Sequence, residues 1–165
     1  TTLEYKTSKK QFQELLDVIE ELKDINIIFT KSNSDTDGRI INKMIDEYVN
    51  KNSYKSVGFA SLGQLRYLSA LRHVDIIVGN SSSGLLEAPS FKIGTINIGD
   101  RQNGRIKAES IIDCSPNSKS IKKAFTKIYS NKFQELLKNV KNPYGNGCAS
   151  QKIIRVLKKK ILIIF

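Results

Sequence analysis

The sequence predicts an α/β fold in which a parallel sheet carries helices on both faces. Short apolar runs alternate along the chain with longer segments whose apolar residues recur at helical spacing. Such alternation is typical of parallel sheets, because each right-handed crossover lays a helix against the sheet. The length of 165 residues suits one domain, since a chain of this size buries roughly two-thirds of its unfolded surface.

Helices are expected wherever apolar residues form a single stripe. The expected helices are residues 8–22, 39–49, 61–72, 119–129, 133–140 and a last one from about residue 150. Ser8 and Gln11 fit a capping box at the start of the first helix. The stripe of the third helix is made of Leu62, Leu65, Leu68 and Leu71.

Strands are expected in five short apolar runs that polar or glycine-containing turns separate. These runs are residues 25–29, 55–59, 74–78, 95–98 and 110–114. Ligands of parallel sheets bind beyond the carboxyl ends of the strands. The loops expected at that edge are residues 30–38, 60–63, 79–84 and 99–105.

The stretch from residue 74 to residue 105 carries the clearest sign of a binding site. A Gly-Asn-Ser-Ser-Ser-Gly turn, residues 79–84, links a strand to a short helix. Backbone N–H groups, serine hydroxyls and the positive end of a helix suit a phosphate group. We therefore expect Ser81 and Ser82 to bind phosphate, the alternative being that they only cap the helix. No lysine follows the second glycine, so the turn is not a P-loop.

Glu87 lies on the helix that follows this turn. It is either a surface charge that the helix dipole favours or the acceptor of the two hydroxyls of a ribose, as acidic residues are in dinucleotide-binding folds. Pro89 removes one backbone hydrogen bond from the same helix, so we expect that helix to be short or kinked.

Two arginines, Arg101 and Arg105, bracket the next loop at this edge. They are either solvated surface charges or partners for a phosphate, since a guanidinium pairs with phosphate through two hydrogen bonds. Asn33, Asp35 and Asp37 resemble a calcium loop, but no glutamate follows at its twelfth position, which favours a cluster of capping residues and no metal.

The remaining composition excludes several classes of protein. Cys114 and Cys148 are far apart and have no histidine companions, so we expect two free, buried thiols and no metal site. His73 is the sole histidine, and a structural role is expected for it. No apolar run approaches the roughly 18 residues of a membrane helix, and the residues from Thr1 do not resemble a signal peptide, so we expect a cytoplasmic protein.

The formal net charge of +11 raises nucleic acid as a possible partner. Lysines scattered over helices and loops supply most of this charge, which favours a solvated surface and a basic cleft that attracts a diphosphate. A basic module that binds nucleic acid remains the non-enzymatic alternative. It would show itself as DNA binding that weakens steeply with salt.

Four segments resemble a known family. They are FTKSNSDTDGRIINKMIDEY, SLGQLRYLSAL, VGNSSSGLLEAPSFKIGTINIGDRQNGR and NPYGNGCASQKI. The chain is similar over nearly its whole length to the carboxyl-terminal half of the hydrolysing UDP-N-acetylglucosamine 2-epimerases of sialic acid biosynthesis. This resemblance implies the carboxyl-terminal, Rossmann-like domain of a two-domain glycosyltransferase-B-type fold with a cleft between its halves.

The resemblance also implies a reaction and a set of site residues. Enzymes of this family eliminate UDP to give a 2-acetamidoglucal and then add water to give N-acetylmannosamine, without a cofactor or metal. By this likeness the chain would hold the UDP. Ser81 and Ser82 would bind the diphosphate, Glu87 the ribose hydroxyls and Arg101 the phosphate side. Asn33 would line the same pocket, the turn from Phe59 would lie near the uracil, and Arg105 is a further candidate.

The family's catalytic carboxylates lie in the amino-terminal half, and its cleft histidine lies just upstream of the position matching Thr1. The resemblance therefore implies a fragment that lacks its catalytic groups and one central strand, with no turnover of its own and a homo-oligomeric full-length enzyme. A glycosyltransferase-B donor domain is the alternative, because it shares the Gly-Ser turn followed by Glu-Ala, although the GDRQNGR loop argues against it.

Overall fold

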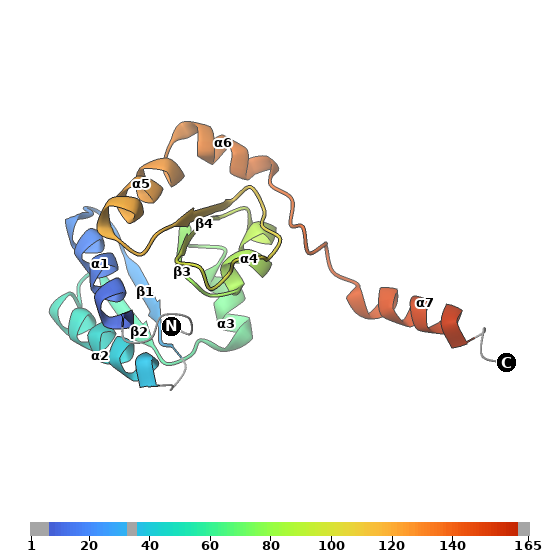
Figure 1. Ribbon diagram of the computed structural model, residues 1–165, viewed down its shortest axis with the longest axis horizontal. Coiled ribbons are helices and arrows are strands. Elements are labelled where there is room, and N and C mark those ends of the chain that lie inside the picture. The colour runs from blue at the N-terminus through green and yellow to red at the C-terminus, as the bar shows by residue number, and fades with distance from the viewer. Residues whose placement is uncertain (1–6, 33–35, 162–165) are drawn as a thin grey trace.

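The computed structural model describes residues 7–32 and 36–161 and confirms the α/β fold with parallel strands. The strands are β1 (Ile27–Thr30), β2 (Ser56–Phe59), β3 (Ile76–Gly79), β4 (Gly94–Ile98) and β5 (Ile111–Cys114). The helices are α1 (Ser8–Glu21), α2 (Thr36–Lys51), α3 (Gly63–Ala70), α4 (Ser83–Leu86), the 3₁₀ turn η1 (Ala88–Phe91), α5 (Ser118–Ile128), α6 (Asn131–Asn139) and α7 (Ala149–Ile161). Figure 1 shows this order.

The five described strands form two parallel sheets instead of the single sheet that the alternation predicts. One sheet pairs β1 with β2, and the other has the order β3-β4-β5. Helix α1 contacts both α2, which covers the smaller sheet, and α5, which covers the larger one. The buried side chains of both sheets consequently belong to one hydrophobic core.

Strand β4 has helices on both of its faces. Neighbouring residues of a strand point to opposite faces. A Cβ at Gly94 would meet Ile128 of α5 at 2.6 Å, whereas the Thr95 hydroxyl donates to the carbonyl of Gly84 in α4 at 3.0 Å. The larger sheet therefore has the predicted three-layer arrangement. It places α4, and with it the predicted phosphate turn, against the face opposite α5.

We expect Gly94→Ala to destabilise the protein by about 1–3 kcal/mol, because the added methyl group overpacks a tight contact. Its Cβ would lie 2.6 Å from Ile128 Cδ1 and 3.2 Å from Phe133 Cε1. Urea unfolding measures the change. Gly58→Ala is the matched control, since its Cβ would meet Ile45 and Val49 at 3.5 and 3.6 Å. A change equal to that of the control would contradict the expected overpacking.

Among the described elements, the smaller sheet has a helix on one face only. Phe29 of β1 packs edge-on against Tyr48 of α2, with ring centroids 5.6 Å apart. On the other face, Ile28 and Val57 pair in register and are 47% and 42% exposed. The described residues therefore leave this apolar face uncovered, which the expectation of helices on both faces did not foresee.

Two local predictions need correction. The leucine stripe of the third helix is not buried as a whole, because α3 has no buried residue and Leu65 is 81% exposed, while Leu71 lies just beyond the helix. None of the described strands packs an apolar face against Leu65. The N-cap residue of the first helix is Thr7, one residue before the predicted Ser8, and Gln11 Nε2 donates to Thr7 Oγ1 at 3.0 Å.

The helix that contains Pro89 is short, as predicted. Helix α4 ends at Leu86, and Pro89 lies in the 3₁₀ turn η1 that follows it. At the other end of the chain, α7 extends away from the rest of the protein (Figure 1), and its described side chains, residues 149–159, are exposed. None of the helices in the described ranges is long and apolar enough to span a membrane.

Candidate functional site

The Gly-Ser turn lies at the carboxyl end of β3, where the sequence predicts it. Gly79 ends the strand with φ +146°, a conformation that side chains disfavour. Ser81 Oγ accepts a hydrogen bond from Ser83 N at 3.3 Å, so this residue caps α4 in part. Ser82 is the N-cap residue, but its side chain makes no capping hydrogen bond. The capping role therefore accounts for Ser81 alone, and the Ser82 hydroxyl remains available to a ligand.

Glu87 lies at the carboxyl end of α4 and is half-buried. Its Oε2 atom is buried without a hydrogen-bond partner among the described residues. Tyr67 of α3 approaches the same place, because its hydroxyl forms a hydrogen bond with Ser83 Oγ. Burial raises the pKa of the Tyr67 hydroxyl, the hydrogen bond with Ser83 lowers it, and the nearby Glu87 carboxylate raises it further. Glu87 thus has one buried carboxylate oxygen and lies near the Tyr67 hydroxyl, which does not fit a fully solvated surface charge.

The loop between β4 and β5 is attached to its surroundings at several points. Gln102 Nε2 donates to the carbonyl of Asn80, next to Ser81, at 2.7 Å. Lys107 Nζ lies 2.8 Å from Asp113 Oδ1 on β5. The Tyr144 hydroxyl donates to the carbonyl of Ile106 at 2.9 Å. These contacts hold the loop against the Gly-Ser turn and fix its backbone just after Arg101 and just after Arg105.

Arg101 and Arg105 are the exposed cations of this loop. Neither forms an ion pair with an acidic side chain of the described residues. Arg101 directly precedes Gln102, so the bond from Gln102 to Asn80 brings its backbone next to the Ser81–Ser82 segment. A restrained loop with unpaired guanidinium groups beside a serine turn suits a phosphate ligand, because preorganised donors lose little entropy on binding.

The other predicted site residues belong to the smaller sheet. Phe59 ends β2 and is 38% exposed at the carboxyl edge, where its carbonyl accepts a hydrogen bond from Lys31 N at 2.9 Å. Asn33 lies outside the described residues, as does Asp35 of the calcium-like segment. The preceding residue is held by α2, because Ser32 N donates to Asn42 Oδ1 at 2.9 Å. The structure therefore brings together the residues of the larger sheet and leaves the role of Asn33 a prediction.

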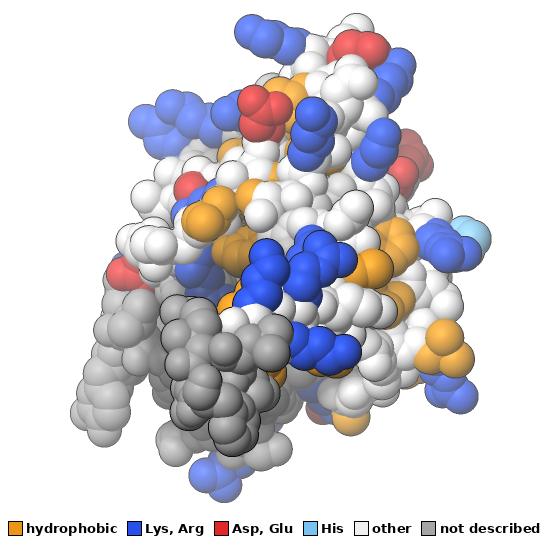
Figure 2. Space-filling model, turned by 90° about the vertical axis from the view of Figure 1, so that its right-hand side faces the viewer, with side chains coloured by type: hydrophobic (Ala, Val, Ile, Leu, Met, Phe, Trp, Pro, Cys, Tyr) orange, Lys and Arg blue, Asp and Glu red, His pale blue; other side chains and the backbone are white. Residues whose placement is uncertain are grey.

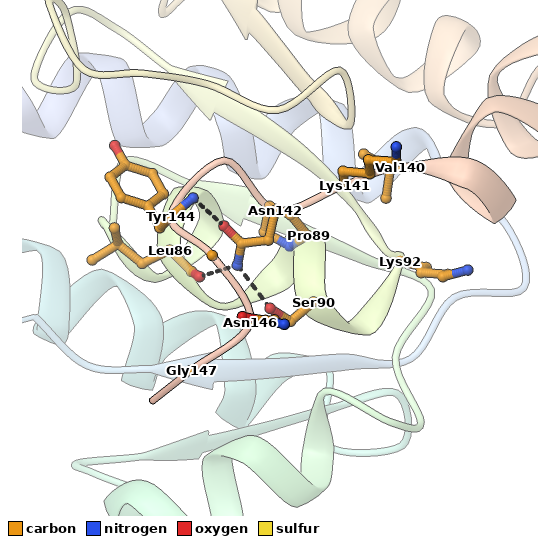
Figure 3. A pocket seen from close by; sticks show the side chains of 11 residues that line it. Leu86, Pro89, Ser90, Lys92, Val140, Lys141, Asn142, Tyr144, Asn146 and Gly147 are labelled. Carbon is orange, nitrogen blue, oxygen red and sulfur yellow. Dashed lines mark hydrogen bonds between the residues drawn. The ribbon is translucent and has the colours of Figure 1, made fainter. Parts of the chain in front are cut away.

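Figure 3 shows a pocket at a different place, between η1 and residues 140–147. The Asn142 side chain lines this pocket, and its Nδ2 atom donates to the Leu86 carbonyl at 2.8 Å and to Ser90 Oγ at 2.7 Å. None of the predicted site residues lines this pocket. The two hydrogen bonds of Asn142 attach the segment before α7 to α4 and η1.

Among the other reactive side chains, Cys148 is exposed, which corrects the prediction of two buried thiols. His73 precedes β3, at the amino edge of the sheet, opposite the Gly-Ser turn. Burial raises the pKa of the Cys114 thiol to about 11, and the neighbouring Asp113 adds to the shift, so this thiol is protonated at neutral pH. Within the described ranges there is no group of three or more His, Cys, Asp or Glu side chains that could hold a metal ion.

Comparison with known proteins identifies the family. A model of the UDP-N-acetylglucosamine 2-epimerase family matches residues 1–158. The chain belongs to this family. Curated relatives of the chain include the GDP/UDP-N,N'-diacetylbacillosamine 2-epimerase (hydrolyzing) of Campylobacter jejuni. That enzyme is 43% identical over 160 residues, which are 97% of this chain and 41% of the relative.

Another relative of the epimerase chain is the polysialic acid biosynthesis protein P7 of Escherichia coli. It is 34% identical over 158 residues, which are 95% of this chain and 40% of that protein. The solved UDP-N-acetylglucosamine 2-epimerase of Methanocaldococcus jannaschii, in complex with UDP-N-acetylglucosamine and UDP, has the same fold, with a TM-score of 0.69 at 23% identity. The likeness covers 93% of this chain and 41% of that one. The chain spans about two-fifths of the length of the curated relatives it matches.

Two residues at the candidate site, Gln102 and Tyr67, are not predicted from the sequence. Gln102 stands inside the GDRQNGR segment, but a polar side chain between two arginines gives no sign of being buried. Tyr67 lies on α3, where the sequence pattern indicates a packing role for the leucines and gives no role to the tyrosine. Gln102 follows Arg101 directly, in a loop expected at the same edge of the sheet as the Gly-Ser turn. This position is the feature of the sequence that could have indicated a contact with the turn.

Proposed function

We propose that this chain is the UDP-binding, carboxyl-terminal half of a hydrolysing UDP-sugar 2-epimerase. The observation that carries the proposal is the buried, unpartnered Oε2 atom of Glu87 beside the Gly-Ser turn. A buried carboxylate oxygen without a donor costs free energy, about 1–3 kcal/mol or more. The hydroxyls of a ribose are donors of the kind that would satisfy it.

The remaining groups of the site suit a diphosphate. The Ser82 hydroxyl makes no capping bond, and Arg101 and Arg105 have no ion-pair partner among the described residues. As the glycosidic C–O bond breaks, negative charge grows on the departing diphosphate. Guanidinium and hydroxyl donors held in place before the reaction stabilise that charge, so they lower the barrier to elimination. In this proposal the chain holds the leaving group, and the other half of the enzyme moves the protons.

We also propose that an amino-terminal half completes the fold and contributes a strand between β1 and β3. Three observations support this. β1 pairs with β2 alone and β3 with β4 alone among the described strands. Ile28 and Val57 are exposed on the smaller sheet, and Leu65 is exposed on α3. The relatives are more than twice as long as this chain. The added strand would join the two sheets into one.

Helix α7 is the second surface that suits the other half. Its exposed apolar residues Ile153, Ile154 and Leu157 share one stripe, and the basic residues Lys152, Arg155 and Lys158 lie outside that stripe. Figure 2 looks along the protein from this end and shows many Lys and Arg side chains with few acidic ones among them. An apolar stripe of this kind is stable only when covered, and the described part of the chain does not cover it.

The names of the relatives leave two candidate sugars. One relative is named for N,N'-diacetylbacillosamine and another for polysialic acid biosynthesis. UDP-N-acetylglucosamine, giving N-acetylmannosamine and UDP, is the substrate that the motifs of this chain favour by resemblance. A UDP-linked N,N'-diacetylbacillosamine is the second candidate, because a relative at 43% identity carries that name.

Incubation of the full-length enzyme with each nucleotide sugar, without an acceptor, tests the proposal. We expect equal amounts of UDP and of the free 2-epimerised sugar from one of the two substrates. In D₂O the product would carry deuterium at C2, because elimination removes that proton and the addition of water returns one from solvent. A nucleotide-sugar transferase would release no sugar until an acceptor is added, which would overturn the epimerase assignment.

A further inference from the structure

Gln102 is a deeply buried polar side chain of the β4–β5 loop. It is 2% exposed, although its neighbours Arg101 and Asn103 are exposed. Its Nε2 atom donates to the carbonyl of Asn80 at 2.7 Å, across 22 residues of sequence. The bond joins the loop that carries Arg101 to the turn that carries Ser81 and Ser82.

Stability alone does not explain a glutamine at this position. Its Oε1 atom is buried without a donor among the described residues. Burying an amide with one unsatisfied atom is unfavourable, and an apolar side chain of similar size would avoid that cost. We therefore look for the role of this amide in the two segments that its Nε2 hydrogen bond joins.

The position of the bond identifies what it holds. Its donor is one residue after Arg101, and its acceptor is one residue before Ser81. Lys107 and Tyr144 attach the far end of the loop, near Ile106, to other elements. Gln102 is consequently the side chain that fixes the separation between the arginine and the serine turn at the near end.

We propose that Gln102 is a positioning residue that holds Arg101 at the correct distance from the Gly-Ser turn for both to bind one diphosphate. This inference rests on the proposed function and extends it. It states that Gln102 increases the affinity for the nucleotide without binding the nucleotide itself. Without the bond, Arg101 must lose conformational freedom when UDP binds, and that loss weakens the complex.

A double-mutant cycle on the full-length enzyme tests this, with UDP affinity measured by calorimetry. Gln102→Met removes the Nε2 donor at nearly constant volume, and Gln102→Asn is too short to span the 2.7 Å contact. We expect either change to weaken UDP binding about tenfold. In an Arg101→Ala background the same change should have an effect of less than about twofold, because the group that it positions is already gone.

Gln134→Met is the matched control, because Gln134 Nε2 also donates to a backbone carbonyl, that of Ile128, at 2.7 Å and lies on α6, outside the site. Its UDP affinity should equal that of the wild-type enzyme. Equal losses from the Gln102 variants with and without Arg101 would overturn the positioning role while leaving UDP binding intact. A wild-type enzyme that does not bind UDP would overturn both this inference and the proposed function. Using two Gln102 variants keeps the test decisive if one of them fails to fold.

Discussion

Arg101→Ala in the full-length enzyme is expected to weaken UDP binding by about 30- to 1,000-fold, which corresponds to about 2–4 kcal/mol. Arg101 is exposed and has no ion-pair partner among the described residues. Gln102, its neighbour, is bonded to the serine turn, so we place its guanidinium at the diphosphate. Isothermal titration calorimetry measures the loss directly.

Two variants make this result specific. Arg101→Lys keeps the charge but loses the two-pronged hydrogen bonding of a guanidinium, so we expect an intermediate loss. Arg72→Ala removes the same charge from an exposed position at the amino edge of β3, opposite the site, and should leave the affinity unchanged. If Arg101→Ala and Arg72→Ala reduced the affinity equally, Arg101 would contribute only to the overall positive charge.

Glu87→Gln is expected to weaken UDP binding by about tenfold or more, because an amide accepts hydroxyl hydrogen bonds less strongly than a carboxylate does. The variant keeps the shape of the side chain, whose Oε2 atom is buried without a partner. The wild-type enzyme should bind UDP more tightly than 2′-deoxy-UDP. In Glu87→Gln the two affinities should come closer together, because the interaction with the ribose is the one removed.

Glu109→Gln is the control for this experiment. Glu109 is exposed, just before β5, at the amino edge of the sheet. Its replacement changes the net charge in the same way and should alter neither the affinity nor the preference for the ribose. An undiminished preference for UDP over 2′-deoxy-UDP in Glu87→Gln would remove Glu87 from the ribose site.

The sequence predicts the order of helices and strands well because each element buries an apolar stripe or run of its own. The expected strand at residues 110–114 is observed as Ile111–Cys114, and the helix at 119–129 as Ser118–Ile128. The division into two sheets could not be predicted, because an apolar run does not reveal which strand lies beside it. The exposure of Leu65 could not be predicted either. A stripe of leucines on a helix is buried only where another element packs against it, and the sequence does not show whether such an element is present.

The sequence indicates those candidate site residues whose own side chains could bind a ligand. It does not indicate residues whose role depends on a contact with a distant part of the chain. Ser82, Glu87 and Arg101 stood out because hydroxyls, carboxylates and guanidinium groups lay at the expected edge of the sheet. The bond between Gln102 and Asn80 joins residues 22 positions apart. Only the fold brings them together. The distinction between capping and ligand binding at Ser81 and Ser82 likewise required the hydrogen bonds of α4.

A crystal structure of the full-length enzyme with UDP would test the central claim most directly. We predict the diphosphate within hydrogen-bonding distance of Ser82 Oγ and the Arg101 guanidinium, and the ribose hydroxyls on Glu87. Gln102 Nε2 should keep its bond to the Asn80 carbonyl. UDP bound elsewhere, for example in the pocket beside Asn142, with Glu87 and Arg101 out of contact with it, would contradict the account.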